Sequence, residues 1–155
     1  MNVVVPDASV ILKWALPSRS EPDADRALLL RNAIRDDLVR AVVPGLWIYE
    51  VGNTIARRFP AHADAWLSAL LKFGLEETPV TQQWLSQVLE LTARYPVSFY
   101  DAAYHATALI HGGVFVTADE RYAGNAMPHG SVVALGVWRP PRKHVRPRTA
   151  HPHVS

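Results

Sequence analysis

Four acidic residues stand beside the ends of predicted strands or the starts of predicted helices. They are Asp7, Glu50, Asp101 and Asp119. Asp7 follows the strand pattern at residues 2–5, and Asp119 follows the strand pattern at residues 114–117. In open parallel sheets, the carboxyl ends of the strands border a common ligand crevice. We therefore expect these side chains to face one crevice, although both aspartates also suit the N-cap position of a following helix.

Carboxylates that converge in this way indicate a metal site. They cannot all remain ionised unless a cation neutralises them. A hard divalent cation such as Mg²⁺ takes oxygen ligands and keeps several of its waters. Beside a phosphodiester, such a cation lowers the pKa of a water and stabilises charge on the transferring phosphate. The acidic residues therefore predict metal-assisted hydrolysis of a phosphodiester.

The elements that must position these acids alternate between strand and helix patterns, which predicts an α/β fold with a parallel sheet. Strands are expected at residues 2–5, 38–43, 75–80, 114–117 and 131–135. Helices are expected at residues 9–16, 21–36, 46–58, 62–73, 82–94 and 99–110, with Ser20, Thr81 and Ser98 as N-caps of the second, fifth and sixth. A core stripe of Trp84, Val88 and Leu91 marks the fifth helix.

Length and composition indicate one folded domain at residues 1–138, followed by a tail. The 155 residues include no cysteine, which excludes disulfides and thiolate metal sites. No targeting segment is evident, and residues 102–118 make a poor membrane span because they contain two histidines and a glycine pair. We therefore expect a cytoplasmic protein without a membrane partner.

The basic charge is concentrated at the C-terminal end. Residues 139–155 are rich in proline and hold five basic residues and no acid. The remainder has 11 basic against 14 acidic residues, a net charge of about −3. We expect a disordered tail; an attraction for phosphate backbones is the alternative.

Four sequence blocks, in order and each holding one of the acids, resemble those of PIN-domain proteins. The blocks are VVPDASVILKW, PGLWIYEVGNTIARR, SFYDAAYHATALI and VFVTADERYA. The closest resemblance is to the VapC-type toxins of bacterial toxin–antitoxin pairs, and it extends from Asn2 to about Leu135.

The resemblance implies a three-layer α/β/α fold with a central parallel sheet of about five strands. It implies an endoribonuclease that depends on Mg²⁺ or Mn²⁺, forms a homodimer and is inhibited by a small antitoxin protein. The four acids match the family's metal and catalytic positions. Ser9 and Thr117 match hydroxyl positions beside that site, and Asn53 shares a helix face with Glu50. Arg121 is a candidate contact for a substrate phosphate.

Other interpretations remain open at this point. An aspartyl-phosphate phosphatase would need a second aspartate two residues after Asp7, where the chain has Ser9. A degenerate, non-catalytic module that binds RNA or protein is the main alternative, and the presence of all four acids argues against it. We expect His105 to be a partly buried, hydrogen-bonded residue rather than a general base. Trp14 and Trp47 are candidates for the groove that receives an antitoxin.

Overall fold

Five parallel strands form the central sheet of the computed structural model, which describes residues 1–143. They are β1 (Asn2–Pro6), β2 (Val39–Pro44), β3 (Glu76–Thr78), β4 (Val114–Thr117) and β5 (Val132–Ala134). The strand order is β3-β2-β1-β4-β5, and every neighbouring pair is parallel. Parallel neighbours need crossover connections, and the helices supply them.

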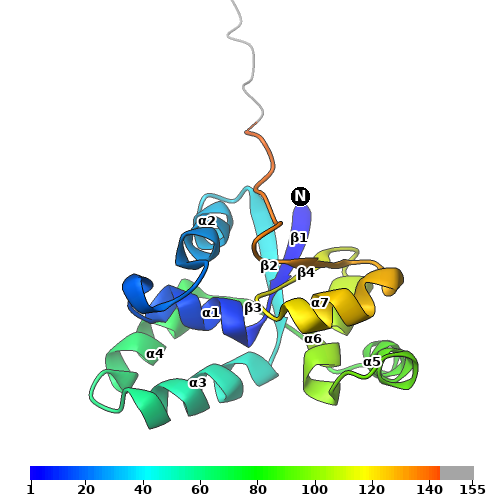
Figure 1. Cartoon of the computed structure of the whole chain (residues 1–155), viewed down its shortest axis with the longest axis horizontal. Helices are drawn as coiled ribbons and strands as arrows, with labels where there is room; N and C mark the ends of the chain where they lie inside the picture. Colours follow the sequence, from blue (N-terminus) through cyan, green and yellow to red (C-terminus); the bar gives the residue numbers. More distant parts are fainter. Residues whose placement is uncertain (144–155) are drawn as a thin grey trace, which may run out of the picture.

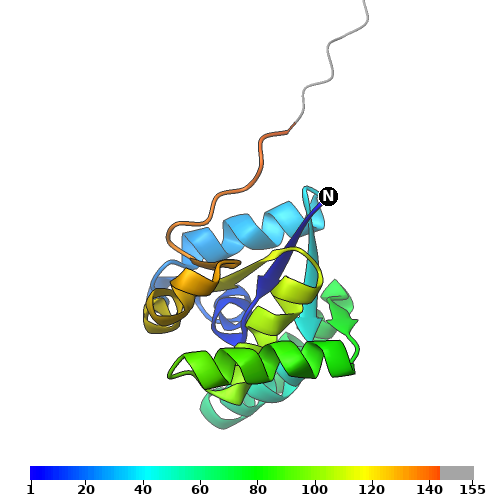
Figure 2. The same cartoon turned by 90° about the vertical axis from the view of Figure 1, so that its right-hand side faces the viewer.

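The helices lie on both faces of this sheet. They are α1 (Ala8–Ala15), α2 (Ala24–Arg35), α3 (Leu46–Arg58), α4 (Ala63–Phe73), α5 (Gln82–Arg94), α6 (Phe99–Ile110) and α7 (Glu120–Ala126). Figure 1 shows α1 to α4 on one side of the sheet and α5 to α7 on the other. This confirms the predicted three-layer α/β/α fold with a five-stranded parallel sheet. In Figure 2, which looks onto the second side, α5 lies outermost and packs against α6.

Alternation along β1 explains how one strand serves two cores. Val4 pairs with Ala41 and is buried in one cluster together with Leu30 of α2. The next residue, Val5, pairs with Phe115 of β4 and belongs to the other cluster. Successive side chains of a strand point to opposite faces, so a fully apolar strand is required between two helix layers.

Several helix starts agree with the predicted caps. The Thr81 hydroxyl accepts the Trp84 backbone N–H at 3.1 Å, and the stripe of Trp84, Val88 and Leu91 is buried. The Ser98 hydroxyl accepts the Asp101 N–H at 3.0 Å, so α6 begins where expected. This cap sets the position of Asp101 in the first turn.

The predicted start of the second helix is wrong. Residues 18–20 form a short 3₁₀ turn, and α2 begins only at Ala24, after Asp23 in a left-handed conformation with φ 56°. Proline disfavours the helical conformation in the residue before it. Accordingly, Glu21 before Pro22 is extended, with φ −113° and ψ 121°.

The described chain ends just beyond the second core cluster. Trp138 is buried in that cluster, and the segment after it leaves the body of the molecule (Figure 1). Residues 144–155, including Arg146 and Arg148, lie outside the described residues, so the predicted disordered tail stays a prediction. Within residues 1–143, none of the helices has the length and apolar character needed to span a membrane.

Candidate active site

Asp7 and Asp119 follow the two strands where the direction of the sheet connections reverses. The chain moves from β1 to β2 and β3 and then returns to β4 on the other side of β1. Ligands of open parallel sheets bind beyond the strand ends at this reversal. Asp7 is the N-cap of α1 and accepts the Val10 N–H at 3.1 Å. Asp119 is the N-cap of α7 and accepts the N–H groups of Arg121 and Tyr122 at 3.0 and 3.1 Å, so each carboxylate is oriented by the start of its helix.

Glu50 and Asp101 enter the same space from two further helices. Glu50 is the fifth residue of α3, and its Oε1 accepts a 2.7 Å hydrogen bond from the Tyr104 hydroxyl. Asp101 lies on α6, three residues before Tyr104. Residues three apart share a helix face. The side chain that orients Glu50 therefore comes from the same face as Asp101.

The four acids line one cavity of about 130 Å³. Its lining consists of Asp7, Ala8, Ser9, Glu50, Asp101, Tyr104 and Asp119. Glu120, the neighbour of Asp119, does not line it. Asn53 is exposed one turn from Glu50 on α3 and does not line it either. Arg121 lies outside this cavity and lines a neighbouring one, which leaves the acid cavity without a cationic side chain.

Two hydroxyl groups connect the ends of β1 and β4. The Thr117 hydroxyl donates to Asp7 Oδ2 and accepts the Asp119 N–H at 3.0 Å. The Ser9 hydroxyl donates to Asp7 Oδ1 and accepts the Ala118 N–H at 3.3 Å. The predicted proximity of both hydroxyls to the acids is present. Because these bonds hold both oxygens of Asp7, its carboxylate has a defined orientation.

Burial and mutual repulsion make the ionised site costly. Burial raises the pKa of Asp7, against the lowering effect of its hydrogen bonds from Ser9 and Thr117. Burial also raises the pKa of Glu50 and of Asp101, and nearby carboxylates raise them further. Groups in this state favour a proton or a cation as a neutralising partner. The electrostatics therefore match those expected of a cation site.

Tyr104 was not predicted from the sequence. It is almost completely buried, and its ring stacks on Phe115 with centroids 5.9 Å apart. A buried tyrosine hydroxyl needs a hydrogen-bond partner, and this one is supplied by Glu50. The feature of the sequence that could have indicated its role is its position three residues after Asp101, on the same face of α6.

Two further residues can be assigned. His105 is fully buried and hydrogen-bonded to the Tyr122 hydroxyl at 2.9 Å and to the Gly130 carbonyl oxygen at 2.7 Å, as expected of a packed histidine. Trp47 is also buried, and its indole N–H donates to Glu77 at 2.9 Å. The suggestion that Trp47 lines an open groove is therefore wrong.

The side chains of the cavity supply carboxylate oxygens, which are the donors that a hydrated divalent cation takes. Within residues 1–143, no group of three or more histidine, aspartate or glutamate side chains is gathered tightly enough to hold a metal by itself. Mg²⁺ is commonly bound through one or two carboxylates while it keeps several waters. A cavity lined by carboxylates with raised pKa values suits that mode.

Most of the chain matches one known protein family. The family model described as "PIN domain" matches residues 4–126. The chain belongs to the PIN domain family. The matched range contains all four acids and ends with α7. A search of curated proteins by sequence finds no significant match.

Solved structures share the fold at low sequence identity. PAE2754 from Pyrobaculum aerophilum has a TM-score of 0.62 and 20% identity, covering 87% of this chain and 90% of that one. VapBC2 from Rickettsia felis, bound to a DNA fragment from their promoter, has a TM-score of 0.64 and 10% identity, covering 88% and 99%. VapC20 from Mycobacterium tuberculosis, a Sarcin-Ricin loop cleaving toxin, has a TM-score of 0.58 and 17% identity, covering 79% and 95%. At these identities the likeness shows a common PIN fold.

Proposed function

We propose that this PIN-domain protein is a Mg²⁺-dependent endoribonuclease that hydrolyses RNA phosphodiesters and acts as the toxin of a toxin–antitoxin pair. The observation that carries the proposal is the single cavity lined by Asp7, Glu50, Asp101 and Asp119 where the sheet connections reverse. PIN-domain proteins are generally nucleases, which supports phosphodiester hydrolysis. Structural neighbours that are toxins, one of them described as cleaving the Sarcin-Ricin loop, support RNA as the substrate.

The residues of the cavity would divide the work between holding the cation and keeping its ligands in place. The four acids would surround a hydrated Mg²⁺ or Mn²⁺ and hold it directly or through its waters; when bound, the ion supplies an activated water and stabilises charge on the phosphate. Ser9 and Thr117 orient Asp7 through its two oxygens. Tyr104 orients Glu50 from the core side. Ligands held in advance lose little freedom when the charged complex forms.

A small antitoxin and a second copy of the chain are the proposed protein partners. Structural neighbours occur in toxin–antitoxin complexes, which supports the antitoxin. For the second copy we propose the face around an apolar cavity of about 300 Å³ where Val80, Phe99 and Tyr100 are exposed. Val80 is 80% exposed, so a Val80→Arg variant should fold and sediment as a monomer. A wild-type protein that is itself monomeric at high concentration would contradict the homodimer. The site of action of such a toxin would be the cytoplasm.

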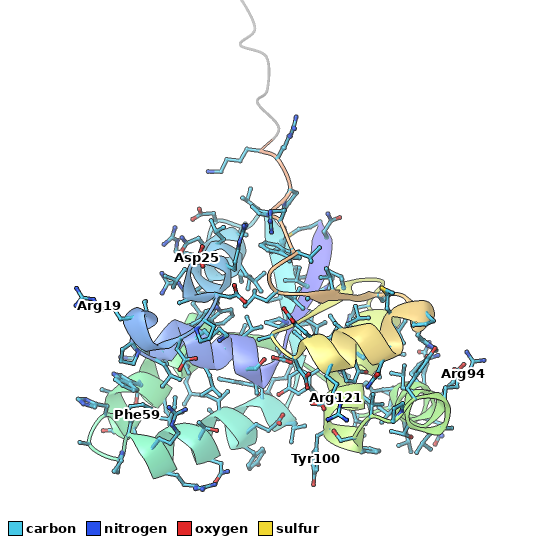
Figure 3. All side chains as sticks on the ribbon, viewed as in Figure 1. Arg19, Asp25, Phe59, Arg94, Tyr100 and Arg121 are labelled. Atoms are coloured by element: carbon cyan, nitrogen blue, oxygen red, sulfur yellow. The ribbon has the colours of Figure 1, made fainter. Side chains whose placement is uncertain are left out.

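Cleavage of total RNA by the purified protein tests the enzymatic proposal. Reactions with Mg²⁺ and with EDTA are compared for the wild type, for Asp101→Asn and for Asp25→Asn. Asp25 is exposed on α2, away from the acid cavity, and is the matched control (Figure 3). Discrete products are expected from the wild type and Asp25→Asn with Mg²⁺ only, and none from Asp101→Asn.

The same proteins are followed by thermal unfolding. A cation that binds only the folded state must raise the melting temperature. Wild type that neither cleaves RNA nor is stabilised by Mg²⁺ or Mn²⁺ would overturn the proposal in favour of a degenerate module.

A further inference from the structure

A second cavity adjoins the acid cavity on the side of α7. Its volume is about 300 Å³, and its lining consists of Pro96, Val97, Ser98, Asp101, Asp119, Arg121, Tyr122 and Asn125. Asp101 and Asp119 line both cavities, so a molecule held at the acids extends directly into this one. Small-molecule sites have volumes of roughly 300–1,000 Å³. The second cavity reaches that range, whereas the acid cavity, at about 130 Å³, does not.

Arg121 is the only cationic side chain among the described residues that line the two cavities. Its backbone N–H donates to Asp119, but no ion pair joins its guanidinium to Asp119, to Asp101 or to any other residue of the range 1–143. The side chain is exposed and lies beneath α7 near the middle of the molecule in Figure 3. An unpaired guanidinium beside two carboxylates provides a site for an anion that the carboxylates alone would repel.

One neutral side chain, Asn125, adds free hydrogen-bonding capacity to the same cavity. Asn125 follows Arg121 by four residues on α7 and therefore shares its helix face. It is half-buried, and its amide makes no hydrogen bond to another residue in the described part of the chain. The Ser98 hydroxyl is already engaged with Asp101: it accepts the Asp101 N–H, and its hydrogen bond to the carboxylate lowers the pKa of Asp101. The Tyr122 hydroxyl is likewise already bonded to His105.

We propose that this second cavity is a nucleotide subsite, which we call the α7 subsite: Arg121 binds the phosphate next to the scissile one, and Asn125 hydrogen-bonds the nucleotide between the two phosphates. The proposal rests on the proposed nuclease function, because it takes the scissile phosphate to lie at the acids. Charge supports it, since Arg121 lines only the second cavity and there offsets the charge of Asp101 and Asp119. Size supports it as well, since only the second of these two cavities has the volume typical of a small-molecule site.

Binding without cleavage tests the subsite first. All proteins carry Asp7→Asn to prevent cleavage, and a fluorescein-labelled single-stranded RNA of mixed sequence is titrated at several salt concentrations by fluorescence anisotropy. Arg121→Gln is expected to weaken binding about tenfold, the loss typical of one charge-assisted phosphate contact. It should also reduce the slope of log K against log salt by about 0.7, the value for one phosphate on a single strand.

Two further variants separate the subsite from general charge. Arg94→Gln is the matched control because Arg94 is exposed on α5, pairs with Glu90 and lies at the far edge of the molecule (Figure 3). It should leave affinity and salt slope unchanged. Asn125→Ala should weaken binding and leave the salt slope unchanged, because the amide carries no charge. Equal effects of Arg121→Gln and Arg94→Gln would overturn the proposal.

Cleavage of modified substrates gives the second arm. Once the cleavage site is mapped, a neutral methylphosphonate replaces each phosphate flanking the scissile one in turn. At one of the two positions it should lower the wild-type kcat/KM about tenfold and have no further effect on Arg121→Gln. Additive losses at both positions would overturn the subsite while leaving the nuclease intact. Absence of any wild-type cleavage would instead defeat the proposed function, and the binding arm would still decide whether Arg121 contacts a phosphate.

Discussion

The phenolic hydroxyl of Tyr104 donates a 2.7 Å hydrogen bond to Glu50 across 54 residues of sequence. The tyrosine ring is held in the core against Phe115, so the position of its hydroxyl is set by packing. Glu50, by comparison, is only half-buried on α3. A buried side chain of α6 thus orients a carboxylate of α3.

Tyr104→Phe keeps the ring and removes this hydrogen bond. The bond lowers the pKa of Glu50, so its loss should raise that pKa further. We expect metal-dependent activity to fall at neutral pH and to recover at higher pH, and the free energy of unfolding to fall by about 1 kcal/mol. Tyr100→Phe, at an exposed tyrosine one turn earlier on α6, is the control. An unchanged activity–pH profile would show that Tyr104 does not act through Glu50.

Asp7→Asn should stabilise the metal-free protein while it abolishes activity. Burial raises the pKa of Asp7 above its unfolded value near 3.8, so its negative charge at neutral pH opposes folding. Asparagine resembles the protonated side chain and removes that cost. We expect a melting temperature about 2–4 °C higher at pH 7, the shift that about 1 kcal/mol produces in a domain of this size.

The pH dependence of this difference has a defined sign. As the pH falls through the raised pKa of Asp7 towards 3.8, the wild-type carboxylate takes up a proton in the folded state first. The cost disappears in that window, so the gap between wild type and Asp7→Asn should close. Mg²⁺ should close the gap at pH 7 by stabilising only the wild type, and EDTA should restore it. A gap that is independent of pH and metal would contradict this account.

His105→Phe should lower stability without changing the chemistry. Nε2 lies 2.7 Å from the Gly130 carbonyl oxygen and so carries the proton, and Nδ1 then accepts the Tyr122 hydroxyl. Burial lowers the pKa of His105, which keeps the ring neutral. Phenylalanine leaves both partners unsatisfied, at an expected cost of about 2–4 kcal/mol in urea unfolding. His62→Phe, which retains stacking on Trp66 at an exposed position, is the control.

The activity of His105→Phe distinguishes packing from catalysis. Below its melting temperature, the variant should retain kcat to within a few-fold and keep every limb of the wild-type pH–rate profile. Loss of one limb together with a large fall in kcat would identify His105 as a general base.

Gly113→Ala should push apart β1 and β4, the two strands that precede Asp7 and Asp119. A Cβ at Gly113 would lie 2.5 Å from the carbonyl oxygen and 2.8 Å from the Cβ of Val3, where β1 and β4 run side by side. We expect a loss of about 1–3 kcal/mol in urea unfolding, with weaker Mg²⁺ stabilisation. Gly52→Ala on α3 meets nothing within 4 Å and should gain up to about 1 kcal/mol. Equal stability of the two variants would show that β1 moves to make room.

Local structure could be predicted closely from the sequence because its signals act over a few residues. Thr81, Ser98 and Asp119 start helices by accepting backbone N–H groups two or three residues on, and those contacts are encoded in the spacing. The failure at Ser20 is also local. Pro22 acts on the residue before it, and that effect outweighed a good capping residue.

The acids were predictable as a set because four ordered sequence blocks resemble those of PIN-domain proteins, and because strand ends and helix starts of a parallel fold lie at one edge of the sheet. Whether each side chain enters the cavity was decided only by the tertiary structure. Asn53 and Glu50 are three residues apart on α3, yet only Glu50 lines the cavity.

The sequence by itself determined the alternation of strands and helices, the caps, and the four acids of the PIN family pattern. Only the tertiary structure decided that Tyr104 holds Glu50, that Thr117 joins Asp7 to Asp119, and that Arg121 stands free beside the acids. The physical reason is distance along the chain. Periodicity and capping depend on neighbours within one turn, whereas these contacts depend on how separate layers pack against the sheet.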